Sequence, residues 1–422
     1  MKIISISNAD GFASKVTPKQ PQKNKKIVQS IIKDVYKNGD SAIKRYEKKF
    51  SKANLSTLVV SKKEISDAYL LTSKDQINAI KNAKKILEKT EKSTKSILKN
   101  QNIKTNGTSI TKKFAPINSV GCYIPGGLAK YPSSAIMSIV PAKVAGVKKI
   151  IAVSPPNSDG KINPMTLVAC DICGADQIFK VGGAQAIAAL SSGTKSISKV
   201  DKIVGPGGAF VTTAKSAVSD ITSIDMLAGP TELGIIADSY ANPKYVALDL
   251  ISQSEHSKDT FCYLITNSAK LAKDVNQNLK EIIPKIKRND YVKTSLKQNG
   301  FIAVCKTKQD MIKIANDLAP EHLQIMTRDA EKISSKIVSP GLILIGNDSP
   351  SSASDYMLGS NHILPTNGFG KTRGSLSVLD FVKVCTYVKT SKASLRKISK
   401  DIDVFTDAEG LSNHYEAVRG RL

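Results

Sequence analysis

The sequence has no tryptophan and only four histidines, and aromatic residues make up 5% of its 422 positions. No apolar run approaches the roughly 18 residues that a membrane-spanning helix needs. The first residues lack an apolar segment followed by a small-residue cleavage site, so no secretory signal is expected. Six dispersed cysteines form no disulfide framework, and the Cys170–Cys173 pair follows an apolar helical stretch. These features predict a cytoplasmic globular protein that has no membrane association and buries that cysteine pair in its core.

Acidic residues are also few, because 36 Asp and Glu stand against 62 Lys and Arg, which gives a net charge of +26. An excess of this size is typical of some nucleic-acid-binding proteins. However, the lysines are spread over the whole chain, and no aromatic residues are interleaved with them as a platform for base stacking. We therefore expect no specific nucleic-acid partner. A basic surface of this kind can attract anionic small molecules, such as a dinucleotide.

Apolar spacing divides the chain into a helical stretch followed by an alternating α/β region. Residues 22–105 are highly charged and show helical spacing, with one helix ending and the next beginning around Gly39. From about residue 111, short β-branched runs alternate with alanine-rich stretches of helical length, which predicts parallel α/β sheets. The last residues, from Ser377, are predicted to form a small helical tail. The strand candidates, numerous enough to favour two sheets, are 120–124, 149–153, 177–181, 202–204, 233–236, 261–265, 301–304 and 342–345.

Three glycine-rich turns follow strand candidates and predict a ligand-binding crevice. They lie at 121–127, 182–185 and 204–210. Glycine at such a turn lets backbone amides approach a dinucleotide closely. None of them matches the G-x-G-x-x-G pattern, and Phe210 stands where the third turn would need its last glycine. Each turn alone is a weak signal, whereas three at strand ends favour a shared site.

The four histidines fall between residues 256 and 414, and each lies in a polar cluster that contains carboxylates or amides. Imidazole titrates near neutrality and binds zinc, so such clusters suit proton transfer or metal binding. Gln253 and His256 are three residues apart in a helix predicted over Tyr245–Ser254 and beyond, and they could share one cation. A polar helix end in solvent is an equally good interpretation of that pair alone.

Glu321 and His322 follow Pro320, which suits the start of a helix. Adjacent acid and imidazole groups can serve as a general base and a proton acceptor. A charged first helical turn in solvent explains the same pattern equally well. Two further clusters, Asp355 with His362 and Glu409 with His414, would each alone suggest only a surface loop or tail.

Taken together, these segments resemble the histidinol dehydrogenase family. The matching segments occur in the same order as in that family, which a chance match does not explain. The resemblance implies an α/β fold of two incomplete Rossmann-like parallel-sheet domains, with a helical N-terminal stretch and a small helical C-terminal tail. It places 1–15 and 116–228 in a first domain on the cofactor side, and 23–105 and 229–360 in a second that carries most metal and catalytic residues. Residues 377–422 would complete the partner's active site in a homodimer. The matching segments are 38–42, 123–127, 182–186, 225–230, 250–256, 319–323, 361–366 and 408–414.

The resemblance also implies roles for individual residues. Glu321 and His322 would be the catalytic pair, and one zinc ion per subunit would be bound by Gln253, His256, Asp355 and His414. The substrate would contact those four ligands and also Thr231, His322, His362 and Glu409. NAD would bind at Tyr123, Gln185 and Gly208. Glu409 and His414 would act in the partner subunit's site.

Three positions depart from the family pattern. Gly208 stands where asparagine is usual, which removes one hydrogen bond to the cofactor, and Thr231 stands where serine is usual, which keeps the hydroxyl. The stretch 368–374 also differs, which bears on the substrate pocket.

The implied reaction is the four-electron, NAD-dependent oxidation of L-histidinol through the aldehyde to L-histidine, the last step of histidine biosynthesis. His322 would accept the alcohol proton, and Glu321 would deprotonate the water that attacks the aldehyde. Cys262 lies in the apolar run 261–265 and is interpreted as core, not as a nucleophile. The alternative is a related zinc- and NAD-dependent dehydrogenase of another small polyol, such as a sulfopropanediol. Because imidazole recognition needs both His362 and Glu409, their presence favours histidinol.

Overall fold

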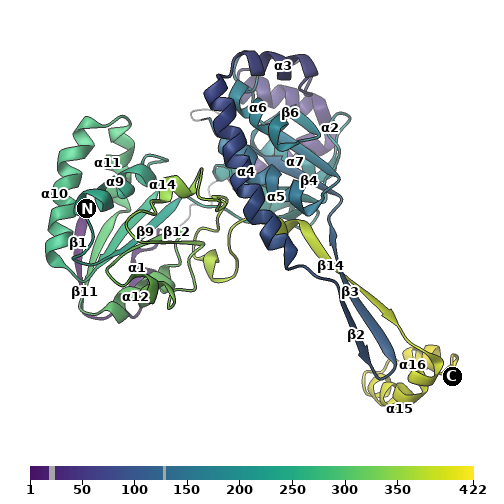
Figure 1. The fold of residues 1–422 in the computed structure, drawn as a ribbon. Helices are drawn as coiled ribbons and strands as arrows, with labels where there is room; N and C mark the ends of the chain where they lie inside the picture. Colours follow the sequence, from purple (N-terminus) through teal and green to yellow (C-terminus); the bar gives the residue numbers. More distant parts are fainter. Residues whose placement is uncertain (19–23, 127–129) are drawn as a thin grey trace.

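The computed structural model describes residues 1–18, 24–126 and 130–422, so Gly127 of the first expected glycine turn lies outside the described residues. Two parallel sheets form the body of the molecule, and a narrow arm projects from it (Figure 1). All eight expected strands are present, and the α/β fold class is confirmed. Among the described residues, no helix is long and apolar enough to cross a membrane.

The five-stranded sheet has the order β6-β5-β4-β7-β8, and all its strands are parallel. Most residues of β4 to β7 are buried, as expected for a sheet covered on both faces, whereas the short edge strand β8 is exposed in part. The strands are β4 (Ser119–Tyr123), β5 (Lys149–Ser154), β6 (Gln177–Lys180), β7 (Lys202–Val204) and β8 (Ser223–Ile224), and the connecting helices are α5 (Pro132–Ala145), α6 (Pro164–Cys173), α7 (Gly183–Ser192) and α8 (Ala209–Val218).

Three N-terminal helices pack onto this same sheet domain: α2 (Lys25–Phe50) on α7, α3 (Lys62–Leu70) on α6, and α4 (Lys74–Ser96) on α5. The helical stretch predicted over residues 22–105 is thereby confirmed for the described residues up to Ser96, but its end is wrong, because Gln101–Thr105 form a strand of the arm. Gly39 has φ 51° and ψ −131° inside α2, so the helix kinks where one helix was expected to end.

The six-stranded sheet has the order β1-β11-β10-β9-β12-β13 and is also parallel throughout. Its strands are β1 (Lys2–Ile6), β9 (Glu232–Ala237), β10 (Phe261–Thr266), β11 (Phe301–Cys305), β12 (His322–Met326) and β13 (Leu342–Ile345). The helices around it are α1 (Phe12–Val16), α9 (Pro243–Ser254), α10 (Ala269–Ile282), η1 (Ile283–Lys285), α11 (Asn289–Gln298), α12 (Lys308–Leu318), α13 (Ala330–Ser334) and α14 (Ser351–Ser354).

The two N-terminal segments are exchanged between the domains relative to our expectation. Residues 1–15 belong to the six-stranded sheet, because β1 pairs with β11 along its whole length. Residues 24–96 belong to the five-stranded sheet domain instead, because the apolar faces of their helices cover it. The physical reason is different for the two segments. β1 pairs with β11 as a parallel edge strand. The amphipathic helices have apolar stripes, which they bury against the five-stranded sheet domain.

The arm is a three-stranded antiparallel sheet that ends in two helices, and the C-terminus lies at its far end (Figure 1). The helical tail expected from Ser377 is therefore wrong in part, because the residues up to Lys389 form the short helix η3 and then a strand, and the helical tail begins at Lys392. The exposed strands of the arm alternate lysine and threonine with apolar residues and bury little, so their pairing is not evident from local pattern. The remaining elements are β2 (Gln101–Thr105), β3 (Thr108–Pro116), η2 (Phe369–Lys371), η3 (Val378–Phe381), β14 (Val382–Lys389), α15 (Lys392–Ala408) and α16 (Ser412–Arg419).

Candidate active site

A cavity of about 260 Å³ lies between the two sheet domains. From the five-stranded sheet it is lined by residues that follow the carboxyl ends of β4, β7 and β8, the usual ligand edge of a parallel sheet. The six-stranded sheet contributes the opposite edge, because Thr231 and His322 stand at the amino ends of β9 and β12. Gln253, His256 and Asp355 also line the cavity, so these expected site residues are brought together.

Glu321 lies immediately before β12, and its carboxylate is held by two donors. Its Oε2 accepts hydrogen bonds from the Thr231 hydroxyl at 2.5 Å and from the Glu232 backbone amide at 2.9 Å. The Glu321 amide in turn donates to the Glu232 carboxylate at 3.2 Å. Burial raises the pKa of Glu321 above its ordinary value, which makes the carboxylate a stronger base.

His322 begins β12, so the helix start predicted behind Pro320 is wrong. Strand geometry sends adjacent side chains to opposite faces, and the ring of His322 is 98% buried at the bottom of the cavity. Its Nδ1 lies 3.3 Å from the Glu232 carbonyl oxygen, and its Nε2 lies 3.4 Å from Asp355 Oδ1. Burial alone would lower the pKa of His322, but the carboxylates of Glu321 and Asp355 outweigh it and raise that pKa to about 9.

Three of the four expected zinc ligands face the cavity. His256 lies just beyond α9, and its amide donates to the Gln253 carbonyl at 3.2 Å, which keeps the two residues one turn apart. The Gln253 amide group donates to Thr231 at 2.8 Å, so its Oε1 is the atom left for a ligand. Asp355 Oδ1 is buried without a hydrogen-bond partner in the described part of the chain. An unpaired buried carboxylate oxygen beside an imidazole and an amide oxygen suits a zinc ion.

The fourth expected ligand is not in the cavity of its own chain. His414 and Glu409 lie in the tail at the end of the arm, and both are exposed (Figure 1). Accordingly, no cluster of three or more His, Cys, Asp or Glu residues with metal-binding geometry occurs in the described ranges. Of the four expected zinc ligands, the described body of the chain contributes His256, Asp355 and the amide group of Gln253.

His362 lies at the cavity wall, where its Nδ1 is 2.9 Å from the Asp355 carbonyl oxygen and its Nε2 is 3.4 Å from the Ser134 hydroxyl. Burial lowers the pKa of His362, which favours the neutral ring. The divergent stretch 368–374 does not line the cavity. The residues that depart from the family pattern there are therefore not part of the cavity wall to which His362 belongs.

Two of the three expected NAD residues, Tyr123 and Gln185, lie around the glycine turn before α7, and Gly208 precedes α8. The Gly183 amide donates to the Tyr123 hydroxyl at 3.1 Å, and Gln185 is buried one turn into the helix. The sequence analysis missed Glu47 of α2, which is fully buried and accepts hydrogen bonds from both the Gly182 amide and Gln185 Nε2. The available signal was a glutamate four residues after Ile43 on the apolar face of a helix.

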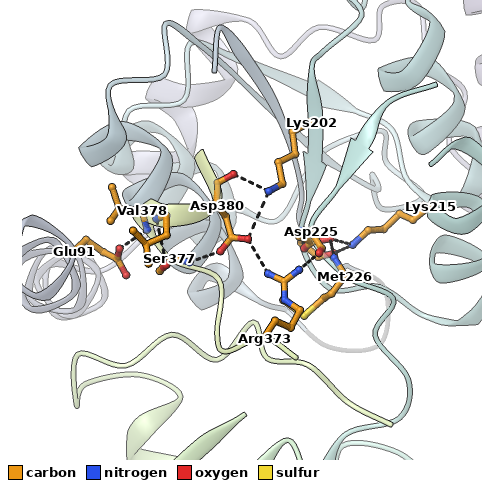
Figure 2. Close-up of polar contacts among 11 residues, drawn as sticks. Glu91, Lys202, Lys215, Asp225, Met226, Arg373, Ser377, Val378 and Asp380 are labelled. Atoms are coloured by element: carbon orange, nitrogen blue, oxygen red, sulfur yellow. Dashed lines mark hydrogen bonds and ion pairs between the residues drawn. The ribbon is translucent and has the colours of Figure 1, made fainter. Parts of the chain in front are cut away.

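A second glycine turn, at Gly205, is fixed by a buried ion pair (Figure 2). The Asp225 carboxylate accepts from the Gly205 amide at 2.8 Å, and Lys215, which pairs with Asp225, donates to the Gly205 carbonyl at 3.0 Å. Arg373 donates to the Asp225 carbonyl and lies 2.8 Å from the Asp380 carboxylate at the root of the arm. This network holds the edge of the cavity where Gly208 lies.

Comparison with known proteins gives evidence on the family of the chain that is independent of the site. Residues 15–422 match the family described as histidinol dehydrogenase. A histidinol dehydrogenase of Methanocaldococcus jannaschii is 42% identical over 395 residues, which cover 94% of this chain and 92% of that protein. One from Clostridium acetobutylicum is 41% identical and covers 100% of this chain and 99% of its own length. The crystal structure of histidinol dehydrogenase from Elizabethkingia anophelis matches with a TM-score of 0.94 at 34% identity, over 100% of this chain and 98% of that chain.

Proposed function

The chain belongs to the histidinol dehydrogenase family and is an oxidoreductase of histidine biosynthesis, and we propose that it converts L-histidinol to L-histidine with two molecules of NAD and one zinc ion per subunit. The observation that carries this proposal is the meeting of Glu321, His322 and Asp355 with Gln253 and His256 around one cavity. The two parallel sheets approach this cavity from opposite edges, which leaves room for a cofactor on one side and a substrate on the other.

In the first oxidation, His322 accepts the proton of the substrate alcohol while hydride leaves to the nicotinamide. Its Nε2 faces Asp355 across 3.4 Å. A zinc ion on Asp355 would offset the charge of that carboxylate and leave the ring neutral before the step, and the Glu321 carboxylate stabilises the imidazolium that forms. The ring is oriented by the Glu232 carbonyl oxygen, which lies 3.3 Å from Nδ1. These contacts support a proton acceptor in a fixed orientation.

In the second oxidation, Glu321 deprotonates the water that attacks the aldehyde, and the resulting diol gives up the second hydride. Oε2 of Glu321 is already occupied by two donors, so Oε1 is the oxygen available to take the proton. Burial raises the pKa of this carboxyl group and so increases its basicity.

The zinc ligands from this chain are Gln253, His256 and Asp355, and a second copy supplies His414. A zinc ion held by these residues would mainly orient the amine and imidazole groups of the substrate and would also supply Lewis-acid polarisation as a lesser role. The position of the tail supports a homodimer, because His414 and Glu409 are exposed in the tail at the end of the arm (Figure 1) and do not line the cavity of their own chain.

The alternative substrate, a sulfopropanediol, is separated from L-histidinol by one comparison. Initial rates of NADH formation are measured with each compound at matched concentrations. We expect turnover of L-histidinol only, since His362 at the cavity wall and Glu409 of the partner are available to bind an imidazole. Faster turnover of the sulfopropanediol would contradict the proposal. Substitution of His362→Ala should raise KM for L-histidinol more than KM for NAD.

A further inference from the structure

Thr231 lies between a proposed zinc ligand and the proposed base, and one oxygen atom contacts both. Thr231 Oγ1 is 2.8 Å from Gln253 Nε2 and 2.5 Å from Glu321 Oε2. An ionised carboxylate only accepts hydrogen bonds, so the threonine hydroxyl donates its single proton to Glu321. The hydroxyl can then only accept from Gln253, which must present its NH₂ group. The direction of this three-residue chain therefore follows from the chemistry of its members.

The Glu232 backbone amide fixes that direction. It donates to the same Oε2 of Glu321 at 2.9 Å, so this oxygen is an acceptor from two sides. A backbone N–H cannot reverse its role, whereas hydroxyl and amide groups can rotate. A reversed chain would require a proton on Oε2 of Glu321, which the ionised carboxylate of a general base does not carry. The arrangement thus keeps the Gln253 carbonyl oxygen turned away from Thr231.

We propose that Thr231 is a positioning residue that presents Gln253 Oε1 to the zinc ion and leaves Glu321 Oε1 as the free base. The proposal rests on the function proposed above and extends it, because the family resemblance implied only a substrate contact for Thr231. The hydroxyl has already used its proton and one acceptor site, which leaves one lone pair for any substrate atom. The β-branch of threonine also restricts χ1, which holds the hydroxyl in place.

Removal of the hydroxyl alone should therefore have two separate effects. The Gln253 amide loses the one hydrogen-bond partner that it has among the described residues and can rotate, and its NH₂ group cannot bind a cation. Glu321 Oε2 loses one of two donors, which leaves the carboxylate less firmly oriented. Partners that orient metal ligands in this way typically contribute about 10- to 100-fold in metal affinity.

The test is the zinc affinity of the full-length protein, measured after metal removal by competition with a chromophoric chelator. Thr231→Val preserves the shape of the side chain and removes the hydroxyl, whereas Thr231→Ser keeps the hydroxyl. Thr94→Val on α4 is the matched control, since the Thr94 hydroxyl donates only within its own helix, to the Thr90 carbonyl at 3.1 Å. We expect Thr231→Val to bind zinc about 10- to 100-fold more weakly than wild type, and Thr231→Ser and Thr94→Val to match wild type.

A second readout separates positioning from general damage. At saturating zinc, Thr231→Val should lower kcat for oxidation of the aldehyde while KM for NAD stays unchanged, and Thr231→Ser should restore kcat. If thermal melting shows that Thr231→Val is unfolded, Thr231→Ala removes the same hydroxyl without added apolar bulk. Equal zinc affinity in wild type and the hydroxyl-free variant would overturn the role of Thr231. Absence of both zinc binding and NADH formation in wild type would instead overturn the proposed function.

Discussion

Glu47 and Gln185 are 138 positions apart in the sequence, yet Glu47 Oε1 accepts a hydrogen bond from Gln185 Nε2 at 2.9 Å. The same oxygen accepts from the Gly182 amide at 2.9 Å, and the other oxygen accepts from the Ser51 hydroxyl at 2.6 Å. A helix outside the sheet thus orients both the glycine turn and an expected NAD residue. Gln185 Oε1 has no partner among the described residues and remains an acceptor.

The first prediction concerns cofactor binding. Glu47→Gln keeps an oxygen for the two donors but removes the negative charge, which weakens both hydrogen bonds and the orientation of Gln185. Since a hydrogen bond to a charged group contributes about 1.5–3 kcal/mol, we expect KM for NAD to rise roughly tenfold or more. KM for L-histidinol should change little. Glu88→Gln on the surface of α4 is the matched control. Equal increases in both KM values would contradict this role.

The second prediction concerns the ion pair at the Gly205 turn (Figure 2). The side chains of Lys215 and Asp225 are only 3% and 0% exposed. Lys215→Met leaves a buried carboxylate without its counter-charge and should lower the free energy of unfolding by about 3–5 kcal/mol. The double variant with Asp225→Asn should lose less than the sum of the two single losses. Additive losses in urea denaturation would show that the pair is not coupled.

The third prediction is a pH dependence of stability that comes from Glu91 on α4. Its carboxylate is buried and accepts from the Val378 amide at 2.6 Å, and burial raises the pKa of Glu91 to about 7. The folded state therefore binds the proton more tightly than the unfolded state, so this contribution to stability is full below about pH 4.5 and is lost as pH rises to about 7. Glu91→Gln should melt higher than wild type near pH 8 and about equally near pH 5. The same difference in melting temperature between wild type and Glu91→Gln at both pH values would contradict the prediction.

The fourth prediction separates the two oxidations. Glu321→Gln should slow aldehyde oxidation more than alcohol oxidation, because only the second step needs a base for water. Cys262→Ser is the control for a thiol mechanism. Cys262 is fully buried on β10, and burial raises its pKa to about 12, so it is a poor nucleophile. Equal losses in both steps for Glu321→Gln, or loss of only the second step for Cys262→Ser, would contradict the assigned chemistry.

The local sequence pattern was sufficient to predict the buried strands and most helices, because apolar runs and the glycines at their ends are short-range signals. It failed at β12, where Pro320 and Glu321 suggested a helix, although the following residues are buried on both sides and lack alternation. It also failed at β14, which pairs with β3 across some 270 positions. The exchange of the N-terminal segments has the same origin, since β1 finds its partner β11 only in the folded chain.

Prediction of the site also succeeded for local segments and failed for contacts between distant residues. The clusters around His256 and His322 were visible as polar segments, and the structure places them in one cavity. Their connection through Thr231 could not be predicted, because it depends on which side of each residue faces the other. The role of Glu47 could not be predicted for the same reason, because it is a single carboxylate on the apolar side of a charged helix.

The central claim is tested most directly by the stoichiometry of NADH formation from L-histidinol. Reduced cofactor is counted per substrate molecule consumed with the protein as prepared, after chelation, and after return of zinc. The account predicts two NADH per L-histidinol, loss of turnover on chelation, and recovery with zinc. One NADH per substrate, or turnover that is unaffected by chelation, would contradict it.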